Sequence, residues 1–179
     1  MPGLTPLAAE DAWVRLARYA LETYVRTGQR PATLPDDLPK ALTRERAGAF
    51  VSLHKDGALR GCIGTIAPTC ENLAWEIVQN AVSACSRDPR FAPVREEELE
   101  ALEYSVDVLG TPEPVENTDD LGPKRYGVIV SAGGRRGLLL PDLDGVDSVR
   151  RQLDIACQKA GIRADEPYTI QRFEVVRHL

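Results

Sequence analysis

Residues 49–66 read AFVSLHKDGALRGCIGTI, and this stretch decides the fold of the region around it. Two apolar runs flank Asp56-Gly57, the strongest short hairpin signal in the chain, because both residues tolerate the positive φ angles of a tight turn. The pattern therefore predicts two antiparallel strands joined by a short loop.

The pairing of these strands follows from which side chains should be buried. A three-residue loop of 55–57 places Leu53 opposite Leu59, and Val51 then faces Gly61. The predicted apolar face consists of Val51, Leu53, Leu59 and Ile63. The predicted opposite face consists of Phe50, Ser52, His54, Arg60, Cys62 and Gly64. A two-residue loop would turn Arg60 towards the core, where an unpaired guanidinium is costly, so we expect the three-residue loop.

Periodicity and capping residues predict three helices, over 6–27, 71–86 and 147–160. Thr5 and Pro6 suit the start of the first helix and Gly28 its end, while Thr69 suits the start of the second. The expected buried stripe of the second helix is Leu73, Ile77, Val78, Ala81, Ala84 and Cys85. The expected buried stripe of the third is Val149, Leu153, Ala156, Cys157 and Ala160, before Gly161.

The remaining segments are predicted from alternation and turn composition. Prolines make 31–39 an extended or turning arm, and 95–110 holds a short helix followed by a strand in which Tyr104, Val106 and Val108 alternate with Ser105 and Asp107. Residues 111–124 have loop composition and suit an internal boundary or mobile flap. A second hairpin turns at Gly133-Gly134, and a final strand closes the chain over 168–179.

This order of elements predicts an α+β fold. An antiparallel sheet is built from two successive hairpin-helix-strand units, with packed helices. The repetition indicates an internal structural repeat, although the two halves share no convincing residue pattern.

Composition excludes several classes of protein. The 179 residues suit one globular domain, with 43% hydrophobic and 27% charged residues. A net charge of -5 argues against a surface that follows a phosphate backbone throughout, although local basic clusters are compatible with it.

Targeting and cysteine signals point to the cytoplasm. No basic region precedes an apolar run near the start, and no window holds about 18 uninterrupted apolar residues, so we expect a soluble cytoplasmic protein without signal peptide or membrane span. The four cysteines have no CxxC spacing and the chain holds two histidines. We therefore expect free thiols and no metal or other cofactor.

Two stretches carry a resemblance to a known family. LRGCIGT at 59–65 and DPRFAPVREEEL at 88–99 resemble the AMMECR family, named for the chromosomal region of Alport syndrome, mental retardation, midface hypoplasia and elliptocytosis. Residues 127–162 and RFEVVRH at 172–178 are similar to its prokaryotic branch, protein A of the AmmeMemoRadiSam system. The resemblance is weakest before Phe50 and over 111–124.

The resemblance implies two related strand-and-helix units sharing one sheet, with a smaller lobe and a cleft. We expect one domain of this family over 1–179, with residues 1–48 forming an N-terminal helix and a proline-rich arm packed on it. Association with a radical S-adenosylmethionine (SAM) protein and a Memo-type protein is also implied, but no established reaction. Any radical chemistry would belong to a partner, because no iron-sulfur cysteine triplet is present.

Cys62 is the main candidate for chemistry. Gly61 and Gly64 permit close backbone approach, and Arg60, on the same strand face by alternation, would favour the thiolate. The competing interpretation is a buried, inert thiol. We favour a binding or structural role over a catalytic nucleophile because no histidine is placed to act as its base. In the expected register His54 pairs with Ala58, too far from Cys62.

Arginines in glycine- or proline-bearing turns form a second signal. The five are Arg60, Arg87, Arg90, Arg135 and Arg136. Guanidinium groups bind carboxylate or phosphate through paired hydrogen bonds, and flanking glycines expose N–H donors. We expect an anion-binding cleft with Gly61, Gly64 and Thr65, in which Arg60 and Arg90 hold the anion. The alternative is solvated or ion-paired arginines, for example Arg90 with Asp88.

Other polar residues have simpler interpretations. Asp88 is expected to form a turn or cap, and Glu96, Glu97 and Glu98 a solvated helix face. Cys70, Cys85 and Cys157 are expected to pack against neighbouring elements.

The leading functional hypothesis is a small component of that system, which binds an anionic small molecule or modified substrate around the RGCIGT strand, with Cys62 contacting or reacting with it. One alternative is a binding adaptor without catalysis, whose partner is the radical SAM protein, the Memo-type protein or, less favoured, RNA. Another is a purely structural domain. We expect no membrane partner, and the sequence does not decide whether the chain is an enzyme.

Overall fold

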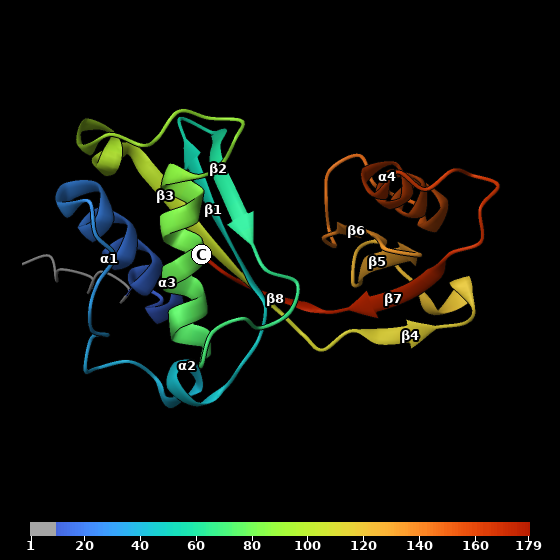
Figure 1. The fold of residues 1–179 in the computed structure, drawn as a ribbon, viewed down its shortest axis with the longest axis horizontal. Coiled ribbons are helices and arrows are strands. Elements are labelled where there is room, and N and C mark those ends of the chain that lie inside the picture. Colours follow the sequence, from blue (N-terminus) through green and yellow to red (C-terminus); the bar gives the residue numbers. More distant parts are fainter. Residues whose placement is uncertain (1–9) are drawn as a thin grey trace, which may run out of the picture. The chain divides into compact units, whose positions relative to one another are not determined.

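The computed structural model describes residues 10–179, which form two compact units with separate sheets and cores (Figure 1). Unit 1 comprises the described residues up to Val108 together with Arg177–Leu179, and unit 2 comprises Leu109–Val176. Within the described residues, no helix combines the length and apolar character needed to cross a membrane.

The helices and strands follow one another in a regular order. The first half of the chain holds α1 (Ala12–Thr27), α2 (Lys40–Arg44), β1 (Ala49–Lys55), β2 (Ala58–Gly64), α3 (Leu73–Ser86), the 3-10 helix η1 (Glu96–Ala101) and β3 (Leu102–Leu109). The second half holds β4 (Glu113–Val115), the 3-10 helix η2 (Thr118–Asp120), β5 (Gly127–Ala132), β6 (Arg135–Leu139), α4 (Val149–Ala160), β7 (Thr169–Phe173) and β8 (Val175–His178).

The chain repeats one arrangement twice. β1, β2, α3 and β3 form a hairpin, helix and strand, and β5, β6, α4 and β7 do the same. The sheet orders are β2-β1-β3-β8 and β4-β7-β5-β6, so in each sheet the third strand pairs with the first strand of the hairpin. The predicted α+β class and the hairpin-helix-strand repeat are confirmed.

The fourth strand of each sheet does not join the strand that precedes it in the chain. β4 follows β3 but pairs with β7, whereas β8 follows β7 but joins β3. The single shared sheet implied by the resemblance is therefore wrong, and the predicted closing strand over 168–179 is two strands in different sheets. β7 already has neighbours on both edges, so the chain end finds its partner at the open edge of β3.

The predicted loop of the first hairpin is also wrong. The turn is the two-residue Asp56-Gly57, with φ angles of 52° and 78°, and the register shifts by one residue between Leu53 and His54. Leu53 therefore pairs with Gly61, and Val51 with Ile63. Arg60 is the extra, unpaired residue of the bulge. Its expected burial was the argument against a two-residue turn.

The bulge also changes the composition of the apolar face. Val51 and Leu53 are fully buried and Ile63 packs against them, as predicted. Leu59 lies before the shift and is 38% exposed, so its predicted place in the core is wrong.

Helix starts differ from prediction because local carboxylate and amide caps are available. α1 begins at Ala12, since Asp11 accepts hydrogen bonds from the backbone N–H groups of Trp13 and Val14. The predicted caps Thr5 and Pro6 lie outside the described residues. Asn72, not Thr69, caps α3. Every residue of the predicted buried stripe of α3 is buried.

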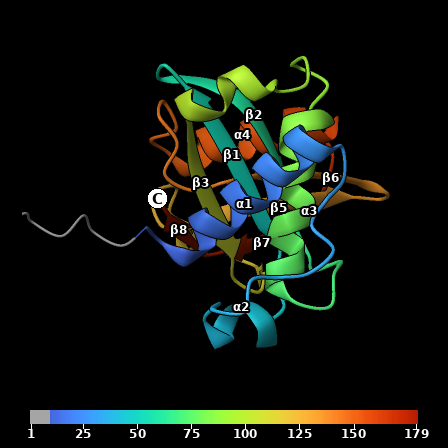
Figure 2. The same cartoon turned by 90° about the vertical axis from the view of Figure 1, so that its left-hand side faces the viewer.

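α1 and α3 pack side by side on one face of the sheet of unit 1 (Figure 2). The side chains of β1 that alternate towards this face, Ala49, Val51 and Leu53, are completely buried. The core of unit 1 therefore lies between this face and the two helices, and the opposite face of the sheet carries the polar side chains of the same strands.

Two glycines at equivalent places in the repeat allow close helix packing. A Cβ atom at Gly61 of β2 would lie 2.4 Å from the carbonyl oxygen of Ala84 in α3. A Cβ atom at Gly137 of β6 would lie 2.2 Å from that of Ala156 in α4. Each hairpin therefore needs a residue without a side chain where its helix crosses.

The segment over 111–124 is more ordered than predicted. It contains β4 at the edge of the second sheet. An edge strand tolerates Pro114, because a proline lacks the backbone N–H that an inner strand would need for pairing. The second hairpin turns at Gly133-Gly134, as predicted. α4 begins after the cap Ser148, and its predicted stripe packs in the core of unit 2.

Candidate functional site

The motif cysteine lies on the polar face of the sheet of unit 1. Because Gly61 faces α3 through Ala84, its neighbour Cys62 points to the opposite face. Cys62 pairs with Ser52 of β1, which in turn pairs with Ser105 of β3. We call Ser52, Cys62 and Ser105, which form one line across three strands, the polar row. The Ser52 hydroxyl donates to Cys62 Sγ over 3.2 Å.

The two motifs that carry the family resemblance meet at Cys62. Asp88 Oδ2 accepts a hydrogen bond from the Cys62 backbone N–H at 3.0 Å. Arg90 Nη2 donates to the Cys62 carbonyl oxygen at 3.3 Å. The guanidinium of Arg90 is held by both oxygens of Asp88, at 3.0 and 2.8 Å. β2 is an edge strand, so this clamp occupies backbone groups that would otherwise be unpaired.

Asp88 is a buried carboxylate with a turn-forming role, as predicted. It accepts the backbone N–H of Arg90 at 3.1 Å. Chiefly through its hydrogen bonds from the Arg90 guanidinium, the pKa of Asp88 lies well below its usual range. The clamp is therefore ionised at neutral pH, and the Arg90 side chain remains 55% exposed.

The Cys62 thiol is protonated more readily than an exposed cysteine. Burial raises its pKa, while the Ser52 hydroxyl and the charge of Arg90 act in the opposite direction. A neighbouring guanidinium, that of Arg90, does favour the thiolate, but burial outweighs it, and the predicted source of this charge is wrong. Arg60, which was to supply that charge, binds Glu98 instead.

Neither histidine hydrogen-bonds Cys62. His178 binds Asp11 over 2.8 Å and stacks on Trp13 with 4.3 Å between ring centroids. His54 lies beyond the bulge, opposite Leu59 rather than the predicted Ala58. The polar row thus has hydroxyl neighbours for its thiol and no imidazole base.

Arg60 is a half-buried member of an ion pair. Its Nε and Nη2 atoms donate to the two carboxylate oxygens of Glu98, at 3.0 and 3.1 Å, and both side chains are 16% exposed. Glu98 also accepts the backbone N–H of Arg95 at 2.8 Å. Chiefly through Arg60, the pKa of Glu98 falls to about 2. The predicted solvated face holds for Glu96 and Glu97 but is wrong for Glu98.

The end of the motif joins β2 to the loop that leads into α3. A Cβ atom at Gly64 would lie 2.2 Å from the ring of Phe50. Thr65 Oγ1 donates to the buried Glu76 at 3.0 Å and accepts from Asn80 at 3.2 Å. These two predicted ligand-binding residues therefore also have packing and hydrogen-bonding roles.

The other predicted arginines lie elsewhere. Arg87 follows α3 in unit 1, and its exposed side chain has no partner among residues 10–179. In unit 2, Arg135 donates to the Gly161 carbonyl at 2.7 Å and pairs with Glu166, while Arg136 is exposed. Of the five arginines, the structure brings only Arg90 into contact with Cys62. Their shared role in one anion-binding cleft stays a prediction.

Sequence reasoning missed a second ion pair on the polar face. Asp107, 2% exposed, accepts from Arg177 Nε and Nη2 at 2.8 and 3.2 Å. Because Asp107 alternates with the apolar Val106, the sequence was sufficient to place Asp107 on the face of the strand that points away from the core. Arg177 lies 70 positions away, and only the return of β8 to this sheet pairs the two.

The four cysteines are free thiols. Cys85 and Cys157 are buried in the two cores, as predicted for packing residues. Cys70 is only partly buried, and its Sγ donates to Gln79 Oε1 at 3.4 Å.

Comparison with known proteins gives consistent results. A sequence profile of the AMMECR1 family matches residues 14–178. A protein of Thermotoga maritima is 51% identical over 175 residues, covering 96% of this chain and 99% of that one. A Clostridium acetobutylicum protein is 48% identical over 169 residues, covering 94% of this chain but 36% of its own longer length.

A solved structure shares the fold. The crystal structure of uncharacterized protein PH0010 from Pyrococcus horikoshii is 35% identical in sequence and has a TM-score of 0.84, with 92% of this chain and 88% of that chain covered.

Proposed function

The chain belongs to the AMMECR1 family, and on that premise we propose that it binds an anionic small molecule of the cytoplasm at the polar row, beside the RGCIGT strand. The observation that carries the proposal is the Asp88–Arg90 clamp at Cys62. It fixes a guanidinium that is 55% exposed at the backbone of Cys62, the residue whose thiol accepts a hydrogen bond from Ser52. A fixed guanidinium binds carboxylate or phosphate with less loss of side-chain entropy than a mobile one.

Each part of the site has a role in this proposal. Arg90 attracts the anion, and the Ser105 hydroxyl donates a hydrogen bond to it, while the Ser52 hydroxyl donates to Cys62 Sγ. Cys62 contacts the ligand as a neutral thiol, because burial raises its pKa. Arg60 acts as a positioning residue, since its guanidinium is engaged by Glu98 and keeps the bulged end of β2 in place.

The test is recovery of a bound metabolite. Purified wild-type chain is incubated with a deproteinised cell extract and washed, and the small molecules that remain are released by denaturation and identified by mass spectrometry. We expect an enriched anion that is lost with Arg90→Gln and reduced with Ser105→Ala and Cys62→Ser. Arg95→Gln, which changes a side chain that is 79% exposed and outside the polar row, should keep it.

The serine and cysteine variants leave the Asp88–Arg90 clamp untouched, so they test the polar row without disturbing the edge of β2. Circular dichroism of each variant reports whether the fold is retained. No enriched anion with the wild-type chain, or equal recovery with all variants, would contradict the proposal.

One observation favours a second candidate function, an adaptor without catalysis. The Clostridium acetobutylicum relative matches this chain over only 36% of its own length, so a domain of this kind also occurs within a larger protein. The partner would be the radical SAM or Memo-type protein implied by the resemblance, or RNA. Co-purification at two salt concentrations distinguishes these partners, because an RNA complex weakens steeply as salt rises.

A further inference from the structure

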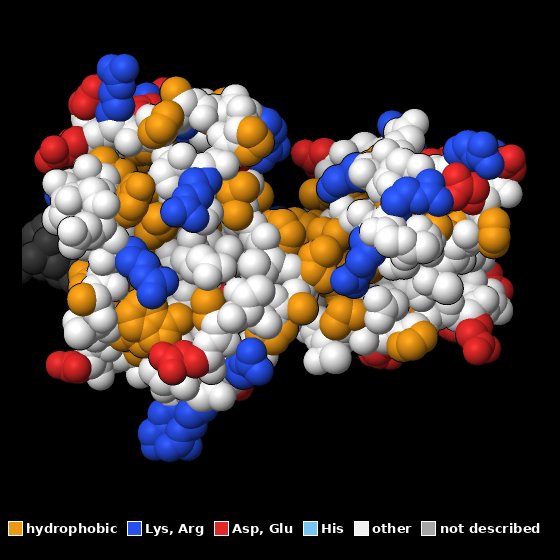
Figure 3. All heavy atoms as spheres, viewed as in Figure 1, with side chains coloured by type: hydrophobic (Ala, Val, Ile, Leu, Met, Phe, Trp, Pro, Cys, Tyr) orange, Lys and Arg blue, Asp and Glu red, His pale blue; other side chains and the backbone are white. Residues whose placement is uncertain are grey.

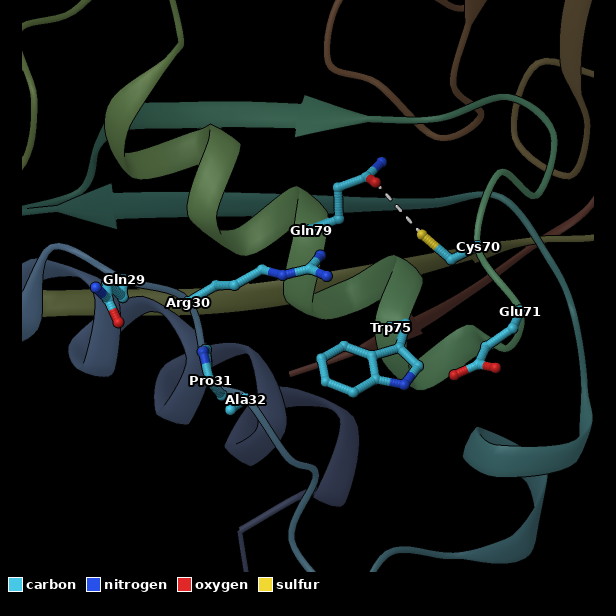
Figure 4. A pocket seen from close by; sticks show the side chains of 8 residues that line it. All are labelled: Gln29, Arg30, Pro31, Ala32, Cys70, Glu71, Trp75 and Gln79. Carbon is cyan, nitrogen blue, oxygen red and sulfur yellow. Dashed lines mark hydrogen bonds between the residues drawn. The ribbon is translucent and has the colours of Figure 1, made fainter.

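A hollow on the outer face of α3 has a composition that the polar row does not explain. The segment after α1 and the exposed side of α3 line a space of about 850 Å³, bordered by Arg30, Cys70, Trp75 and Gln79 (Figure 4). A space of about 380 Å³ is bordered by Arg30, Gln79, Val82, Ser83 and Arg87. The two spaces share Arg30 and Gln79, so they adjoin each other, and we refer to them together as the hollow.

Two guanidinium groups border the smaller space without a counter-charge. Neither Arg30 nor Arg87 has a carboxylate within ion-pair distance among residues 10–179. By contrast, Arg60 and Arg90 are each bound by both oxygens of a carboxylate. In a chain of net charge -5, two unpaired cations at one hollow attract an anion.

Neutral groups complete the smaller space. The Ser83 hydroxyl makes no hydrogen bond within the described part of the chain and is available as a donor. The Gln79 amide is fixed, because its Nε2 donates to Thr69 at 3.2 Å and its Oε1 accepts from Cys70 at 3.4 Å. A space bordered by a hydroxyl and two guanidinium groups is a suitable environment for the three oxygens of a phosphate monoester.

The larger space adds an apolar wall. The Arg30 side chain reaches from the segment after α1 towards α3, and its guanidinium lies between Gln79 and Trp75 (Figure 4). The Arg30 guanidinium lies 5.4 Å from the centre of the Trp75 ring system. Glu71 lies on the other side of Trp75 and does not border the smaller space. The same face of unit 1 shows basic and hydrophobic side chains close together (Figure 3).

We propose that this hollow binds a small phosphate monoester, with the phosphate between Arg30 and Arg87 and the apolar part of the molecule against Trp75. Two guanidinium groups match the double charge of a monoester, and the adjoining space accommodates the group that the phosphate esterifies. The hollow lies on the helical face of the sheet, whereas the Cys62 side chain points to the opposite face. The proposal is therefore independent of ligand binding at the polar row.

The test uses the full chain and phenyl phosphate as the probe, with inorganic phosphate and phenol as partial probes. Calorimetry should give a dissociation constant below about 1 mM for phenyl phosphate, tighter than either partial probe and weaker as salt rises. Arg30→Gln and Arg87→Gln should each raise this constant about 10-fold. Arg44→Gln, a change of an exposed arginine in α2, is the matched control and should leave it unchanged.

Amide chemical shifts locate the probe. We expect shifts at Gln79, Ser83 and Arg87 and none at Ser52 or Cys62. Absence of binding, undiminished binding to the Arg30→Gln and Arg87→Gln double variant, or shifts at the polar row instead would overturn the proposal. Equal affinity for inorganic phosphate would overturn the part assigned to Trp75.

Discussion

Replacing Glu98 with glutamine isolates the ion pair at the bulge of β2. The Glu98→Gln change keeps the shape of the side chain and removes the charge that faces Arg60 and Lys55. The Arg60 side chain, which is only 16% exposed, then lacks a full counter-charge. Unit 1 should therefore lose stability at neutral pH.

The size of the loss follows from the pKa of Glu98, which lies at about 2 in the folded chain. The usual value is about 4.3, and each pKa unit corresponds to about 1.4 kcal/mol, so the full shift corresponds to about 3 kcal/mol. Screening by solvent at the partly exposed side chain lowers this to about 2 kcal/mol. Because folding lowers the pKa, this stability is present above about pH 4.3 and is lost as the pH falls towards 2.

Urea unfolding followed by tryptophan fluorescence measures this difference. Both tryptophans, Trp13 and Trp75, lie in unit 1, so the signal reports its unfolding. Wild type and Glu98→Gln should differ by about 2 kcal/mol at pH 7 and by about 1 kcal/mol at pH 3. Glu97→Gln changes an adjacent carboxylate that is 71% exposed and should differ from wild type by less than about 0.5 kcal/mol at either pH. A loss that is equal at both pH values, or no larger than that of Glu97→Gln, would refute the reasoning.

Three further changes test other parts of the fold and site. Gly61→Ala should destabilise unit 1 by about 2 kcal/mol or more, because the new methyl group meets the Ala84 carbonyl at 2.4 Å. The control Gly134→Ala places its methyl group where no atom lies within 4 Å, so it should lower stability far less. Thermal unfolding measures both variants. Cys62 should react with iodoacetamide at pH 7 more slowly than glutathione does, and faster as the pH rises, because burial raises its pKa. Peptide mapping by mass spectrometry measures the rate at Cys62. A rate equal to that of glutathione would contradict the burial argument. Asp11→Ala should lower stability by about 1 kcal/mol or more, measured by urea unfolding, through loss of the α1 cap and of the His178 contact. An unchanged midpoint would contradict a stabilising role of either contact.

The candidate site shows how far local reasoning reaches. The motif residues Cys62 and Arg90 were recognised from their sequence context, and alternation placed Ser105 opposite the core. Their assembly into a clamp and a polar row depends on strand register, and the one-residue bulge at Arg60 shifted that register. The side chain of the bulged residue Arg60 is held by Glu98, which lies 38 positions away in the sequence.

The hollow on α3 shows the same limit. Arg87 was singled out from its turn context, but Arg30 was missed because it lies in a proline-rich segment with no regular period. The four-residue spacing of Trp75, Gln79, Ser83 and Arg87 marks one side of a helix, opposite its buried stripe, and is the signal that was available. That Arg30 faces this side becomes evident only when α1 and α3 pack together.

The amino-acid sequence by itself determined α1, α3 and α4, the presence of the two hairpins and the buried stripe of α3, because periodicity and turn chemistry act within a few residues. It also determined the repeated hairpin-helix-strand order. The tertiary structure decided which sheet β4 and β8 join. β4 follows β3 in the chain but pairs with β7, and β8 follows β7 but joins β3. Such pairing depends on backbone hydrogen bonds between distant segments, which are nearly independent of side-chain identity and leave little mark on the sequence.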